Sequence, residues 1–176
     1  VAAPTDASAT LSFTSRPMKL TELNYPDVLY VAENMREWDK REIYAGRFTD
    51  EPHDLAESIC LTGGISFVVK TDDDEPVVVF GVVPISPTFW NVYMFCTDKF
   101  HTVAIELGKY IKRIIIPGVM TTGALRAECR SMEGHLDAHR WLRFLGFQFE
   151  GENRMLGKHG ETFYLFAFTQ TGLQTD

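Results

Sequence analysis

The chain has 176 residues, of which 45% are hydrophobic and 12% aromatic, and this composition excludes a disordered protein over most of its length. Its formal net charge of −7 argues against a nucleic-acid-binding protein, and no apolar run approaches the roughly 20 residues of a membrane span. Cys60, Cys96 and Cys129 are odd in number and far apart, which favours buried thiols in a reduced, cytoplasmic compartment over a disulfide framework or a zinc site.

The N-terminal part of the chain predicts an arm and a weak strand. Val1–Thr10 is small and polar, which is typical of a flexible segment, and it lacks the basic and apolar regions of a signal peptide. Leu11–Met18 alternates weakly as a strand that ends at Arg16-Pro17. We therefore expect one domain over residues 11–170, followed by a short tail, residues 171–176.

Helical spacing of apolar residues follows this strand. Tyr25–Ala45 predicts two short helices broken near Glu37. A further helix is predicted from His53, after a proline, to a stop at Gly63-Gly64. Its inward-facing side chains are expected to be Leu55, Ile59 and Cys60.

The spacing then changes to that of strands. "ISFVVKTDDDEPVVVFGVV" consists of two β-branched runs around an acidic turn and predicts a hairpin, and "FWNVYMFC" predicts a further strand. Thr97 or Asp98 could cap the next helix, which is expected over about Phe100–Ile115 and should end at Pro117-Gly118.

The last third of the chain predicts strand, helix and two strands. "ALRAECRS" alternates apolar and charged residues, as a half-buried strand does. The following helix should bury Ala138, Trp141, Leu142 and Leu145, expose His139 and Arg140, and stop at Gly146. Two strands are then expected, Phe147–Arg154 and Thr162–Thr169.

This order of elements resembles the GNAT superfamily of N-acetyltransferases over about Leu11 to Thr169. The residues that carry the resemblance are "SRPMKLTELNYPDVL" near the start and "HLDAHRWLRFLGFQFEGENR" near the end. Within the superfamily, "MREWDKREIYA" and "MFCTDKFHTVAIELGKYIKRI" are similar to small GNAT-like proteins encoded by tailed phages. The resemblance implies a mixed α/β fold with a twisted, mostly antiparallel sheet of about seven strands flanked by helices. It also implies that Phe89–Thr97 and Ala124–Ser131 are parallel neighbours that diverge.

The resemblance further implies acetyl-CoA as a co-substrate, bound between these two strands. Its pantetheine would pair with exposed backbone and its pyrophosphate would lie on N–H groups at the next helix start. The residues that would bind it are Phe95, Cys96, Thr97, His101, Thr102 and Val103. The family's Gln/Arg-x-x-Gly-x-Gly/Ala cradle aligns with Phe100, Val103 and Ile105, and β-branched side chains block the close approach that glycine permits.

Catalytic residues are also implied only in part. The family's proton-donating Tyr aligns with Leu142, which cannot donate a proton, and its helix-leading Asn aligns with His135. Glu128 or His135 could act as the base for an amine, and Tyr93 could replace the missing acid. Equally, Glu128 could pair with a neighbouring arginine, His135 could lie exposed at a helix start, and Tyr93 could belong to the core.

Charge is divided between the two halves of the chain. Residues 1–98 hold 16 acidic and 7 basic side chains, and residues 99–176 hold 8 and 10. Either this is a solvated surface, or the first half attracts a cationic group. In the second case Glu37, Asp39 and Glu42 could bind an amine substrate; otherwise they form a solvated helix face.

Two functions remain open. The first is an N-acetyltransferase for a protein or small-molecule amine. The second is a GNAT-fold interaction or virion-associated protein, with a partner chain or a second copy held by the arm. For either, we expect no metal, nucleic acid or membrane, and a location in a cytoplasm or a virion.

Overall fold

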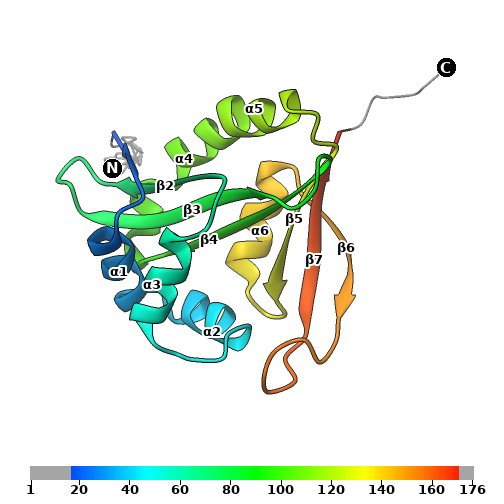
Figure 1. The fold of residues 1–176 in the computed structure, drawn as a ribbon, viewed down its shortest axis with the longest axis horizontal. Coiled ribbons are helices and arrows are strands. Elements are labelled where there is room, and N and C mark those ends of the chain that lie inside the picture. Colours follow the sequence, from blue (N-terminus) through cyan, green and yellow to red (C-terminus); the bar gives the residue numbers. More distant parts are fainter. Residues whose placement is uncertain (1–16, 171–176) are drawn as a thin grey trace, which may run out of the picture.

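The computed structural model describes residues 17–170, in which seven strands form one sheet in the order β1-β2-β3-β4-β5-β7-β6 (Figure 1). The strands are β1 Lys19–Glu22, β2 Ile65–Lys70, β3 Pro76–Pro84, β4 Phe89–Cys96, β5 Arg126–Met132, β6 Gln148–Asn153 and β7 Phe163–Thr169. All neighbours are antiparallel except β4 and β5. The predicted fold class is confirmed.

The parallel pair β4–β5 is short. Only Phe89↔Arg126, Trp90↔Ala127 and Asn91↔Glu128 are paired, although β4 continues for five residues and β5 for four residues beyond this seam. The two strands therefore diverge towards their carboxyl ends, as predicted. This divergence leaves the facing backbone groups of both strands without strand partners.

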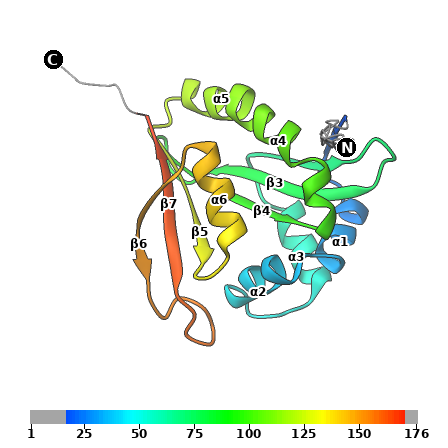
Figure 2. The ribbon, with the colours of Figure 1, turned by 180° about the vertical axis from the view of Figure 1, so that it is seen from behind.

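Helices cover the two faces of the sheet (Figures 1 and 2). On one face lie α1 Tyr25–Glu33, α2 Glu37–Ala45 and α3 Pro52–Cys60; on the other lie α4 Ala104–Tyr110, α5 Ile116–Thr121 and α6 Leu136–Leu145. The predicted break between the first two helices is confirmed. None of the helices in the described range is both long enough and apolar enough to cross a membrane.

The burial of α3 differs from the prediction at one residue. Leu55 and Ala56 are buried and Ile59 is partly buried, but Cys60 is exposed. At about 100° per residue, position 60 lies some 140° away from position 55 around the helix, outside the apolar stripe. Cys96 and Cys129 are buried as expected.

The predicted stop at Pro117-Gly118 is wrong. A 3₁₀ turn, η1 Asp98–Thr102, leads into α4, and a π-helical turn, η2 Ile111–Ile115, joins α4 to α5. Pro117 lies in the first turn of α5, where its missing N–H removes no intrahelical bond. The π-helical turn shifts the hydrogen-bond pattern before the proline, so the helix continues to Thr121.

The C-terminal elements agree with the prediction apart from His139. Gly146 ends α6 with φ of +99°, a left-handed conformation that favours glycine. His139, expected on the polar face, is buried against Tyr164 and Phe166, because its Nε2 reaches the Met132 carbonyl at 3.1 Å. Residues 1–16 and 171–176, which contain the predicted arm, tail and most of the first predicted strand, lie outside the described residues.

Candidate ligand site between strands β4 and β5

A cavity of about 260 Å³ opens where β4 and β5 diverge. Most of its lining is apolar and comes from the sheet and from the helices on the α4–α6 face. The apolar lining includes Val82, Val92, Met94, Ile111, Ile115, Val119, Ala127, Trp141, Leu142, Leu145 and Phe147. Polar side chains lie at the α2 side, and they include Arg36, Asp39, Glu42, Ser131 and His135.

Asp39 binds the end of β4. Its Oδ2 accepts a hydrogen bond from the Cys96 backbone N–H at 2.7 Å, and its Oδ1 accepts from the Arg36 guanidinium at 2.6 and 3.2 Å. The Arg36 N–H in turn donates to the Cys96 carbonyl at 2.9 Å. Both backbone groups that the last β4 residue turns towards the gap are therefore bonded to the chain's own residues 36–39.

The thiol of Cys96 belongs to the same network. It donates to Asp39 Oδ2 at 3.1 Å and is buried. Burial raises the pKa of this thiol far above its ordinary value, and the Asp39 carboxylate raises it further. Cys96 is therefore a neutral, structural thiol.

Glu42 binds β5 in the corresponding way. One turn after Asp39 on α2, its Oε2 accepts from the Ser131 hydroxyl at 2.8 Å, the Met132 N–H at 2.7 Å and His135 Nδ1 at 2.9 Å. Because residues three apart share a helix face, α2 contacts β4 through Asp39 and β5 through Glu42. Helix α2 thus places two carboxylates between the diverging ends of β4 and β5.

His135 is a further buried polar group of the site. Its ring is 2% exposed and stacks on Trp38, with 5.5 Å between ring centroids. Since a carboxylate only accepts, the bond to Glu42 assigns the proton to Nδ1. Nε2 has no hydrogen-bond partner within residues 17–170, and Asp39 Oδ1 lies 3.4 Å away. In the described part of the chain no His, Cys, Asp or Glu side chains form a group that could hold a metal ion.

The residues predicted from sequence for catalysis and substrate binding divide into two groups. Asp39, Glu42, His135 and Tyr93 line the cavity together. Glu37 is exposed on α2 and points elsewhere. The Tyr93 hydroxyl donates to Ser66 Oγ at 3.0 Å; burial raises its pKa above the ordinary value.

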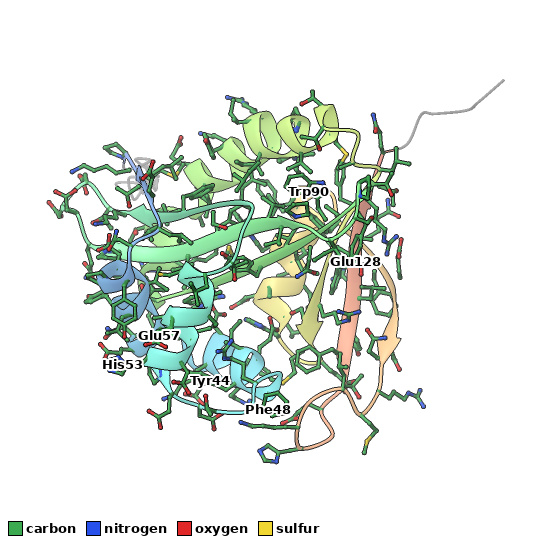
Figure 3. All side chains as sticks on the ribbon, in the orientation of Figure 1. Tyr44, Phe48, His53, Glu57, Trp90 and Glu128 are labelled. Atoms are coloured by element: carbon green, nitrogen blue, oxygen red, sulfur yellow. The ribbon has the colours of Figure 1, made fainter. Side chains whose placement is uncertain are left out.

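Glu128, which is labelled in Figure 3, is not among the residues that line the cavity. It accepts from Arg126 Nε at 2.7 Å, and the same arginine also pairs with Glu150. This is the pairing with a neighbouring arginine that the sequence left open. The carboxylate is engaged in a surface ion-pair network on β5 and β6.

Residues around the predicted pyrophosphate position, among them Thr97 and Val103, bond within the chain. Thr97 Oγ1 caps the Lys99 N–H, the Phe100 N–H donates to the Thr97 carbonyl, and the Val103 N–H donates to the Phe100 carbonyl at 3.1 Å. Val103 is 1% exposed, in the hydrophobic cluster between the sheet and helices α4–α6. These three N–H groups are therefore already satisfied.

The remaining predicted cofactor residues also have local roles. His101 Nδ1 lies 3.0 Å from the Asp98 carbonyl, and the Thr102 hydroxyl donates to the Lys99 carbonyl. Phe95 is fully buried in the hydrophobic cluster on the other face of the sheet, which includes residues of α1 and α3. Their side chains are used by the fold itself.

An aromatic contact joins the turn η1 to α6 beside the cavity. Phe100 meets Trp141 edge to face, with centroids 5.1 Å apart, and Trp141 packs on Phe144. Gly108 makes room for them, since a Cβ there would lie 2.6 Å from Phe144 Cε1. Both η1 and α4 therefore pack against the aromatic side chains of α6.

Sequence reasoning missed Arg36, Ser131 and the apolar lining. The spacing of Asp39 and Glu42 placed them on one helix face, but it carried no signal for partners 57 and 93 residues away. Ser131 ends an alternating strand as one small polar residue among several.

Comparison with known proteins finds relatives by structure and none by sequence. No protein-family model and no curated protein matches the chain. The fold is similar to a GNAT-family acetyltransferase from Bacillus anthracis, with TM-score 0.67 and 13% identity over 88% of this chain and 96% of that chain. It is also similar to the ribosomal-protein-S18-alanine N-acetyltransferase from Escherichia coli, with TM-score 0.64 and 11% identity over 91% and 99% of the two chains. A mutant spermidine N-acetyltransferase from Vibrio cholerae gives TM-score 0.62 and 13% identity over 88% and 94%.

These likenesses show the fold. The chain has the fold of these GNAT-family acetyltransferases. The particular similarity to phage proteins stays a prediction.

Proposed function

We propose that this chain is a GNAT-fold binding protein that no longer uses acetyl-CoA in the manner of its fold family. The observation that carries the proposal is the bonding at Cys96. Its N–H and carbonyl lie on the side of β4 where an acyl donor would pair, and they are bonded to Asp39 and Arg36. The chain thus occupies its own donor position.

Acetyl-CoA does not fit the residues present. Besides the bonded Cys96 backbone, the N–H groups of Lys99, Phe100 and Val103 at the helix start are already bonded within the chain, and Trp141 of α6 packs against Phe100 of η1. Displacing Asp39 from a buried guanidinium and a backbone N–H costs about 3–5 kcal/mol. At 1.4 kcal/mol per tenfold, this weakens donor binding by roughly 10²-fold or more.

A second candidate, amine acetylation, is favoured by one observation. His135 lies at the polar end of the cavity with Nδ1 bonded to Glu42, and its Nε2 has no hydrogen-bond partner within residues 17–170. A histidine oriented by a carboxylate is an arrangement that can take a proton from an amine. This candidate requires residues 36–39 to leave Cys96.

Calorimetric titration with acetyl-CoA separates the two candidates. The proposal expects no binding heat up to millimolar acetyl-CoA and no acetyl transfer to spermidine or to peptide amines above the rate without protein. A GNAT acetyltransferase with an established donor site serves as the positive control. Micromolar binding together with transfer that His135→Ala abolishes would establish the second candidate and overturn the first.

The finer predictions from the sequence stay part of the proposal. We infer a phage origin, a cytoplasmic or virion location, and a protein partner or second copy bound by residues 1–10. Truncation of residues 1–10 should leave the melting temperature nearly unchanged and weaken self-association in sedimentation velocity. A large loss of melting temperature in the truncated chain would contradict the role of the arm.

A further inference from the structure

His135 Nε2 is a buried nitrogen without a hydrogen-bond partner, and His135 lines the cavity. The neighbouring carboxylate oxygen, Asp39 Oδ1 at 3.4 Å, is already bonded twice by Arg36. In the tautomer with its single proton on Nδ1, Nε2 is an acceptor, and no described group donates to it. Buried polar atoms of this kind are rare and point to a group that completes them.

The size and lining of the cavity define the rest of such a group. Its volume of about 260 Å³ exceeds the roughly 150 Å³ of an engineered apolar cavity that binds benzene. Val92, Met94, Ile115 and Leu142 are among the side chains that surround it. An apolar molecule with several more carbon atoms than benzene therefore fits this lining.

Charge at the polar end argues for an uncharged head group. Asp39 is matched by Arg36, and Glu42 Oε2 already accepts three hydrogen bonds. An anionic head would meet the carboxylates of the buried Asp39 and the partly buried Glu42, and a cationic head would meet the Arg36 guanidinium that also lines the cavity. A hydroxyl avoids both costs and supplies the donor that Nε2 lacks.

We propose that the β4–β5 cavity binds an uncharged apolar alcohol, with its hydroxyl donating to His135 Nε2 and its carbon chain among the apolar residues of the α4–α6 face. This inference deepens the proposed function, because it names the class of ligand that the protein binds in place of an acyl donor.

Calorimetry with four probes, 1-octanol and three compounds with the same chain length but other head groups, tests the head group. We expect 1-octanol to bind at least tenfold more tightly than its methyl ether, which keeps the oxygen but has no proton to donate. Octanoate and octylamine should bind more weakly than 1-octanol. Equal affinity for the ether would overturn the bond to Nε2, and equal or tighter binding of either ion would overturn the uncharged head group.

Cavity-filling variants test the location. Ala127→Leu places three carbon atoms in the cavity and should abolish 1-octanol binding, whereas Ala104→Leu, on α4 outside the lining, should leave it unchanged. If circular dichroism shows that Ala127→Leu does not fold, Ala138→Leu replaces it, since Ala138 also lines the cavity. Binding that survives a folded cavity-filling variant would overturn the site.

The two proposals fail in different ways. Tight acetyl-CoA binding would overturn the proposed function whatever the alcohol does. If the protein bound neither acetyl-CoA nor 1-octanol, only the proposal of an alcohol ligand would be overturned.

Discussion

Replacing Asp39 with alanine should destabilise the protein strongly. The carboxylate is 3% exposed and accepts from the Arg36 guanidinium, the Cys96 N–H and the Cys96 thiol. Removing one partner of a buried ion pair costs about 3–5 kcal/mol. Because the Arg36 side chain keeps 18% exposure and can recruit water, we expect a value near the lower end of that range.

Urea unfolding measures this loss, and a melting temperature provides a second reading. At roughly 2–4 °C per kcal/mol for a domain of this size, a loss of about 3 kcal/mol lowers the melting temperature by about 6–12 °C. Adding Arg36→Met to Asp39→Ala should recover part of the loss, because no buried charge is then left unpaired.

The matched control is Asp137→Ala. Asp137 also pairs with an arginine three residues away, Arg140 at 3.3 Å, but both side chains are 75% exposed. Such a pair contributes less than about 1 kcal/mol. If Asp39→Ala cost no more than Asp137→Ala, Asp39 would not hold the end of β4, and the argument from the bonded Cys96 backbone would be refuted.

Two further predictions concern pH and packing. Burial lowers the pKa of His139 from its ordinary 6.5, so its contribution to stability is complete above about pH 6.5 and is lost as the pH falls towards the folded-state pKa. The variant His139→Phe should therefore lose less melting temperature than the wild type between about pH 7.5 and pH 5, and parallel profiles would count against this origin of the pH dependence. Gly108→Ala should cost about 1–3 kcal/mol in urea unfolding, because its Cβ would meet Phe144 at 2.6 Å and Trp141 at 3.0 Å. Gly118→Ala, with nothing within 4 Å, should instead stabilise α5 by about 0.4–1 kcal/mol, and equal effects at the two sites would show that the aromatic contact is not tightly packed.

Elements with strong local signals could be predicted from the sequence. The hairpin of β2 and β3 has two β-branched runs around a turn, and α6 has an apolar stripe with Gly146 at its end. The diverging strands followed from the order of elements and the family resemblance. Pro117 misled the prediction because the π-helical turn before it leaves no mark in the sequence.

The bonding inside the site could not be predicted. Nothing in "EWDKREIYA" distinguishes a carboxylate that caps a distant strand from one that faces water, so Asp39 and Glu42 fitted a substrate-binding helix equally well. His139 shows the same difficulty, since a histidine flanked by polar residues on a helix can still reach a backbone carbonyl. Long-range hydrogen bonds decide both cases, and periodicity does not report them.

The three-pair seam between β4 and β5 has the fewest paired positions of any junction in the described sheet, so we expect β1–β4 and β5–β7 to behave as two cooperative units. The polar bonds that join the units through α2 connect residues 57 to 93 positions apart, so the chain closes large loops before it gains them. Assembly of the two units should thus be a late folding event, and native-state hydrogen exchange should detect their separation below the global unfolding energy. In such an opening, the amide hydrogens of Cys96 and Met132 would exchange together, although they lie on different strands.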